Sequence, residues 1–145
     1  MLDPKHIGLK LPAFQATAEA GRLRFFAQAI GETNPIYIDE SAARDAGHPG
    51  LPLPPTFLFS LELESPSSAW RDDIGIRIER ILHGEQTFAY HRMAYAGDTF
   101  TFEGRITDIY SKKGGALSFV VKESRVTNQR GEHVADLRSV IVHKN

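Results

Sequence analysis

Apolar residues recur at helical spacing in the first third of the chain and alternate with polar residues in the last third. A spacing of i, i+3, i+4 and i+7 predicts a helix over residues 18–30, with Thr17 as its N-cap and Gly31 as its C-terminal stop. The apolar positions that set this spacing are Leu23, Phe26, Ala27 and Ile30. A second, shorter helix is expected over residues 40–46, after a capping Asp39.

The middle of the chain changes character twice. Residues 48–55 contain four prolines, which indicates an ordered, extended loop. Residues 56–63 are apolar nearly all round, which favours a buried helix, although a short buried strand has the same pattern. A polar link at about residues 65–73 then separates this helical part from a β part.

From about residue 76 onward the pattern alternates with period two, as it does in β-strands. Strands are predicted over residues 76–92, 99–106, 117–122 and 134–142, with turns at residues 96–98, 112–115 and 128–131. The last three strands should form an antiparallel meander, and the apolar helix is the best available cover for one face of it. The predicted fold class is therefore α+β, a curved antiparallel β-sheet wrapped around a central helix, in a single domain over residues 1–145.

Composition narrows the class of protein. The chain has 145 residues, a formal net charge of −1 and no cysteine. Because the chain has no excess of basic residues, binding to nucleic acid is not expected. Because it has no cysteine, it forms no disulfides, which fits a cytoplasmic protein. No apolar run has the length of a signal peptide or a membrane span, so no membrane association is expected. No metal-ligand motif or glycine-rich phosphate loop occurs, so neither a metal nor a cofactor is expected.

The stretch from Gly31 to Tyr37, GETNPIY, carries the most chemistry. A carboxylate at Glu32 is a possible general base, whereas a tyrosine, with an ordinary pKa of about 10, is better suited to donating a hydrogen bond. The structural alternative needs no chemistry. Gly31 would end a helix, Asn34 and Pro35 would make a turn, and Tyr37 would be an amphipathic residue at a surface or interface.

Other side chains are weaker candidates. His83 and Glu85 would share one face of a strand, which places an acid beside a base, but such a pair is more often simply solvated. His48 lies in the proline-rich loop, where residues often touch ligands. His91 and Arg92 have the charge to bind an anionic ligand, but they also fit the polar end of a strand.

Seven segments together carry a resemblance that covers nearly the whole chain: residues 7–8, 11–14, 26–37, 46–49, 54–57, 82–86 and 96–99. In these segments the chain resembles the MaoC-like hydratase/dehydratase family of the hotdog fold, and within it the N-terminal dehydratase-like half. Catalytic members of the family carry Gly-Asp-x-Asn-Pro-x-His. Here Gly31, Asn34 and Pro35 keep their places, while Glu32 and Tyr37 stand where the aspartate and the histidine would be.

The resemblance implies a reaction and a site. In the family, the aspartate and the histidine activate a water that adds across the double bond of an enoyl thioester, and the reverse reaction is dehydration. The substrate would be a thioester of coenzyme A or acyl carrier protein, with its acyl chain in a tunnel beside the central helix and the site at a dimer interface. The residues predicted to contact substrate are His48, Pro55, Thr56, Phe57, His83 and Gly84.

The altered pair leaves three functions open, all in acyl-thioester (fatty acyl-CoA) metabolism. The first is the non-catalytic, tunnel-shaping half of an (R)-specific enoyl-CoA hydratase or 3-hydroxyacyl-thioester dehydratase, in a heterodimer with a catalytic hotdog subunit. The second is a self-sufficient homodimer that uses Glu32. The extra methylene of Glu32 weighs against the second, because a displacement of roughly 1 Å can cost about a hundredfold in rate. The third is an acyl-CoA-binding module without turnover.

Overall fold

Five antiparallel strands form the framework of the computed structural model, which describes residues 1–145. They are β1 (Phe14–Thr17), β2 (Ile81–Tyr90), β3 (Thr99–Lys112), β4 (Leu117–Thr127) and β5 (His133–Lys144), in the order β1-β3-β4-β5-β2. The three long strands β3, β4 and β5 are neighbours in both sequence and space, which confirms the predicted meander.

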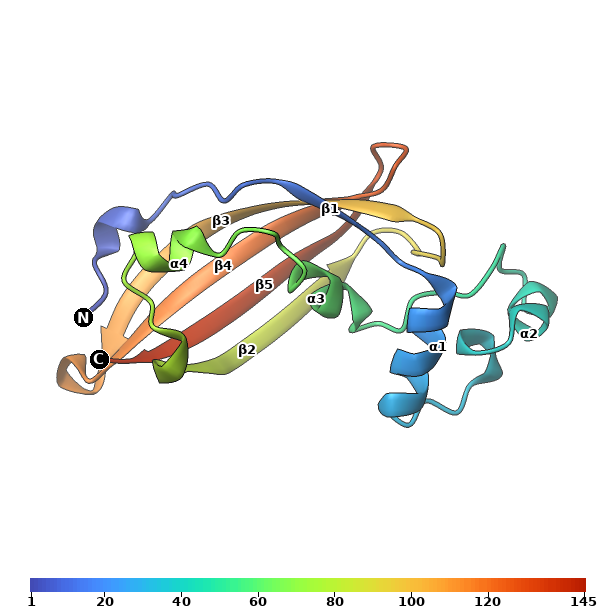
Figure 1. Ribbon diagram of the computed structural model, residues 1–145, viewed down its shortest axis with the longest axis horizontal. Coiled ribbons are helices and arrows are strands. Elements are labelled where there is room, and N and C mark those ends of the chain that lie inside the picture. Colours follow the sequence, from blue (N-terminus) through green and yellow to red (C-terminus); the bar gives the residue numbers. More distant parts are fainter.

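Four α-helices accompany the sheet (Figure 1). They are α1 (Ala20–Ala29), α2 (Glu40–Asp45), α3 (Phe57–Glu62) and α4 (Ala69–Asp73). In Figure 1, α3 and α4 lie over one face of the sheet, whereas α1 and α2 extend past one of its ends. Short 3₁₀ helices occupy Pro4–His6, Pro35–Tyr37, Ile78–Arg80 and Lys113–Gly115. No helix of the structure combines the length and the apolar character needed to cross a membrane.

The main core lies between α3 and the sheet. Phe57, Leu58 and Leu61 of α3 are almost fully buried in one apolar cluster with side chains of β3, β4 and β5. The sheet contributes Phe100, Phe102, Val126, Ala135 and Leu137 to it. Segment 56–63 is thus a buried helix rather than a strand, and the predicted α+β hotdog architecture is confirmed.

A second apolar cluster corrects the prediction of a polar link at residues 65–73. This segment contains α4, whose Trp70 is buried together with Ile74 and Ile76. These side chains cover Ile106 and Val120 near the other end of the sheet. The link therefore extends the cover provided by α3, because its Trp70 packs in this cluster although Ala69 beside it is exposed.

The N-terminal region differs from the prediction at one element. Residues Phe14–Thr17 form the short strand β1, paired with β3, where only helical and loop signals were predicted. Thr17 is therefore not a helix cap: its hydroxyl lies 2.8 Å from that of Thr99 across the strand pair, and α1 begins after Glu19 without a side-chain cap. Asp39 caps α2 as predicted.

Candidate functional site

The turn after α1 is built by its own side chains. Gly31 has a φ of +72°, a left-handed conformation that glycine adopts without a steric penalty. One carboxylate oxygen of Glu32, Oε1, accepts hydrogen bonds from the backbone amides of Thr33 and Asn34, both at 3.0 Å. The side chain of Asn34 in turn accepts from the amide of Ile36 at 3.2 Å. The carboxylate at the family's aspartate position thus stabilises the shape of the turn.

Tyr37 follows in the 3₁₀ helix Pro35–Tyr37 and faces a pocket of about 390 Å³. The pocket is lined by Tyr37, Leu53, Pro55, Tyr90, His91, Arg92, Met93 and Ala94. Glu32 is not among the lining residues, and no hydrogen bond joins it to Tyr37. The two residues at the family's catalytic positions therefore face different surroundings within this chain.

A second tyrosine, Tyr90, also lines the pocket. The Tyr90 hydroxyl donates a hydrogen bond to the carbonyl oxygen of Pro55 at 2.6 Å, which ties the end of β2 to the loop before α3. Burial, with a smaller contribution from the Tyr37 phenol, raises the pKa of Tyr90 well above its usual value. Both effects keep this phenol neutral, so it acts as a hydrogen-bond donor.

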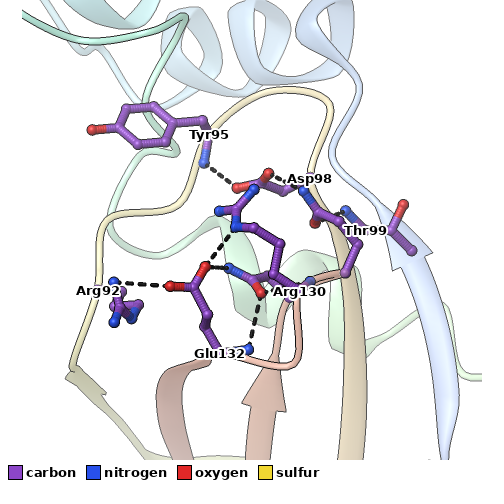
Figure 2. Close-up of polar contacts among 8 residues, drawn as sticks. Arg92, Tyr95, Asp98, Thr99, Arg130 and Glu132 are labelled. Carbon is purple, nitrogen blue, oxygen red and sulfur yellow. Dashed lines mark hydrogen bonds and ion pairs between the residues drawn. The ribbon is translucent and has the colours of Figure 1, made fainter.

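A polar network holds the loop between β2 and β3 that lines the pocket (Figure 2). The buried carboxylate of Asp98 accepts from the Tyr95 amide at 3.0 Å and from the Gln129 side chain at 2.8 Å. Glu132, beyond the turn that connects β4 and β5, forms an ion pair with Arg92 at 3.0 Å. Apart from the hydrogen bond between Tyr95 and Asp98, each of these contacts joins segments that are far apart in sequence. The wall of the pocket therefore depends on tertiary structure.

His83 and Gly84 lie at an irregular point of β2. His83 pairs with Ile141 and Glu85 with its neighbour Val140, so Gly84 is the extra residue of a β-bulge. The expectation that His83 and Glu85 share a face is therefore wrong. His83 packs edge-on against Phe59 of α3, with ring centroids 5.3 Å apart, while Glu85 pairs with Arg138 at 3.2 Å.

The remaining predicted contact residues are dispersed. His48 lies 3.2 Å from the Tyr95 hydroxyl, in the loop before α3. Thr56 is exposed at the N-terminus of α3, and Phe57 is buried against Phe26. Of the residues predicted to contact substrate, Pro55 alone lines the pocket that contains Tyr37.

Two features were not predicted, one in the pocket and one in the core outside it. Tyr90 and Met93 line the pocket, yet nothing in the local sequence marks them, because the pocket forms only when β2 meets the loop before α3. Glu62 of α3 is buried: Ser124 donates to its Oε1 at 2.7 Å, Lys122 lies 2.5 Å from that oxygen, and its Oε2 has no partner. Its position next to Leu61 at the end of an apolar run was the available signal.

The comparisons with known proteins define the class. Residues 5–137 match the model of the FAS1-like, dehydratase domain region family, and the chain belongs to this family. Its predicted membership of the MaoC-like hotdog hydratases and dehydratases is thereby confirmed. A UPF0336 protein of Streptomyces coelicolor is 38% identical over 136 residues, which cover 92% of this chain and 89% of that protein.

Solved structures share the fold. The truncated HadBC (3R-hydroxyacyl-ACP dehydratase) complex of Mycobacterium tuberculosis aligns with a TM-score of 0.78 and 23% identity, over 94% of this chain and 96% of the matching chain. A MaoC-like dehydratase aligns with a TM-score of 0.85 and 22% identity, over 97% of this chain but only 42% of its own. In the second case one hotdog unit is therefore less than half of the longer chain.

Proposed function

We propose that this chain is the non-catalytic half of an (R)-specific enoyl-CoA hydratase or 3-hydroxyacyl-thioester dehydratase, in a heterodimer with a hotdog subunit that carries the intact Asp/His pair. One observation carries the proposal: Glu32 uses a carboxylate oxygen to hold its own turn and lies outside the pocket that Tyr37 lines. A general base must come within hydrogen-bond reach of the proton it removes. The residues at the catalytic positions are thus suited to maintaining the shape of the turn and the pocket rather than to proton transfer.

The pocket supports a thioester ligand. Its lining combines apolar side chains such as Leu53 and Met93 with the phenol of Tyr37 and with two groups that can be cationic, His91 and Arg92. Binding sites for small molecules are typically apolar with a few polar groups that fix orientation. An acyl chain would contact the apolar side, and the anionic carrier would lie toward His91 and Arg92.

The edge of the sheet supports a partner. In the strand order β1-β3-β4-β5-β2, β2 pairs only with β5, so its other edge has no strand beside it. An open edge strand of ten residues offers unpaired backbone groups to another chain, although the bulge at Gly84 interrupts this edge. Exposed apolar side chains lie on this strand and just beyond its ends: Leu82 on β2, Ile78 before it and Met93 after it. A subunit paired at β2 would also close the pocket, which lies at the end of that strand.

The related structures agree with this arrangement. HadBC is a complex, and the MaoC-like dehydratase chain is more than twice as long as the region that matches. Both facts are consistent with a hotdog unit that works beside a second one.

Co-expression tests the proposal. The chain should copurify with a MaoC-like subunit that carries the intact motif, with one copy of each by light scattering. Leu82→Lys places a charge on the exposed edge and should abolish the complex. Phe25→Lys, at an even more exposed apolar position on α1, should not. A chain that remains a homodimer in the presence of such a partner, and hydrates crotonyl-CoA by itself, would sink the proposal.

A second candidate is a self-sufficient homodimer that uses Glu32. It is favoured by the half-buried position of this side chain and by its second oxygen, Oε2, which no hydrogen bond engages. In that case Glu32→Gln abolishes turnover of the isolated chain without unfolding it. If the chain binds crotonyl-CoA saturably but has neither turnover nor a partner, it is a binding module, and both proposals fail.

A further inference from the structure

Two histidines and an aspartate converge where β2 ends and β5 begins. His91 follows the last residue of β2, His133 is the first residue of β5, and Asp136 lies three positions further along β5. The Nε2 atom of His91 lies 2.8 Å from one carboxylate oxygen of Asp136, and the Nε2 atom of His133 lies 2.7 Å from the other. All three potential ligand atoms lie within 4.8 Å of one another.

A backbone irregularity explains why they meet. In the pairing of β4 with β5, Val126 faces Ala135 but the next residue, Thr127, faces His133, so Val134 is an extra residue in β5. Strand residues three apart normally point to opposite faces of a sheet. The bulge turns His133 onto the face of Asp136, in keeping with the known effect of bulges on side-chain direction.

The main chain brings His91 to the same place. The amide of His91 donates to the carbonyl oxygen of Val134 at 2.8 Å, which extends the pairing of β2 with β5 by one residue. The two imidazole rings then lie with their centroids 4.4 Å apart. The positions of the three side chains are therefore fixed by paired strands.

We propose that His91, His133 and Asp136 bind a divalent transition-metal ion of the zinc class. Two imidazole nitrogens and a carboxylate oxygen are ligands that Zn²⁺ accepts, and three protein ligands leave a fourth position for water. Tetrahedral bonds of about 2.0–2.2 Å require ligand atoms roughly 3.3 Å apart. Each histidine nitrogen now lies 2.7–2.8 Å from a different oxygen of Asp136, so the side chains must move apart slightly to admit an ion. The three side chains are 45%, 31% and 49% exposed, so they can rotate by the small amount needed and metal can reach them.

The surrounding charges affect the affinity in a defined way. Arg92, the neighbour of His91, is paired with Glu132 at 3.0 Å. Arg125 is the residue of β4 opposite Asp136 and is exposed. Its positive charge opposes a cation at the site, so Arg125→Gln should tighten metal binding while leaving all three ligands in place.

Such an ion would act on the pocket through one wall. His91 lines the pocket that contains Tyr37, and it lies between Tyr90 and Arg92, which line it too. Metal bound at this cluster ties the end of β2 to β5. It therefore restrains the pocket wall whether or not the chain works with a partner.

The test is a calorimetric titration of the untagged, chelator-treated chain with Zn²⁺. One ion should bind per chain, and Mg²⁺ at the same concentration should not compete, because imidazole ligands select against it. His91→Ala and His133→Ala should each weaken Zn²⁺ binding about tenfold or more. His6→Ala removes a half-buried histidine outside the cluster and should have no effect.

Thermal unfolding provides a second measurement. Saturating Zn²⁺ should raise the Tm of the wild-type chain, since a ligand that binds only the folded state stabilises it, and should leave the Tm of the two histidine variants unchanged. Absence of saturable binding would overturn the proposal. Equal losses in His6→Ala and His91→Ala would overturn it too, because they would indicate diffuse binding by surface histidines.

Discussion

The turn at residues 31–37 and the pocket wall at residues 90–98 face the same candidate site but are held in different ways. The turn is stabilised by hydrogen bonds between residues one or two apart: the amides of Thr33 and Asn34 donate to Glu32, and the amide of Ile36 donates to the Asn34 side chain. The wall is held mainly by contacts between residues far apart in sequence. Tyr90 contacts Pro55, 35 residues away; Asp98 contacts Gln129, 31 residues away; and Arg92 contacts Glu132, 40 residues away. A sequence motif can therefore keep the shape of the turn after its proton chemistry has changed.

The largest predicted loss of stability follows a substitution in the pocket wall. Asp98→Ala removes the acceptor for the Tyr95 amide and the Gln129 side chain at a buried position, so it should lower the free energy of unfolding by about 3 kcal/mol. Urea denaturation measures this. Asp45→Ala, at an exposed position of α2, should stay within about 0.5 kcal/mol of wild type. Equal effects of the two substitutions would contradict the role of the network.

Substitutions at two glycines distinguish the stability cost of steric crowding from that of an unfavourable backbone conformation. A Cβ at Gly84 would lie 2.9 Å from Cγ2 of Val142 and 3.1 Å from the Val140 carbonyl oxygen, so Gly84→Ala should cost about 2 kcal/mol. A Cβ at Gly31 would meet nothing within 4 Å, and Gly31→Ala should cost only the left-handed conformation, about 1 kcal/mol. Gly21→Ala, within α1, should instead stabilise by about 0.5–1 kcal/mol. Denaturant midpoints of the three variants test this order.

A smaller effect is expected at Glu32. Glu32→Ala removes the acceptor for two amides of the turn and should cost about 1 kcal/mol, similar to the loss of a helix cap. Glu32→Gln keeps an oxygen that can accept both bonds and should cost less than half of that. If both substitutions destabilise equally, the negative charge and not the hydrogen bonding holds the turn.

The smallest effect depends on pH. Because the pKa of Tyr90 is raised on folding, its contribution to stability is complete below the unfolded-state pKa of about 10 and is lost as the pH rises above it. Tyr90→Phe should therefore lose less stability than wild type between neutral and strongly alkaline pH. Tyr110→Phe, on β3 and outside the pocket, should behave as wild type. Parallel urea titrations at each pH measure the difference.

The sequence was most informative where structure is local. The cap at Asp39, the glycine stop at Gly31 and the hairpin turn at residues 112–115 each depend on neighbouring residues, and all three are present. Segment 56–63 was ambiguous by pattern alone, and packing on the sheet makes it a helix. Strand β1 was missed because its four residues acquire their structure from pairing with β3.

The errors at the site have the same origin. His83 and Glu85 alternate in sequence, but the bulge at Gly84 reverses that relationship. A glycine inside a strand pattern was the available local signal of this bulge. Tyr90 joins the pocket because β2 reaches Pro55 in three dimensions. The sequence thus identified the residues of the motif, but it did not identify the residues from other parts of the chain that surround them in the fold.

The central claim is that this chain supplies shape and its partner supplies the proton chemistry. The most direct measurement is the rate of crotonyl-CoA hydration by the heterodimer in which this chain carries Glu32→Gln. We expect a kcat close to that of the unmodified heterodimer, and a loss of activity when the aspartate of the partner's motif is changed to asparagine. A hydration rate that collapses with Glu32→Gln, while the complex stays assembled, would contradict it.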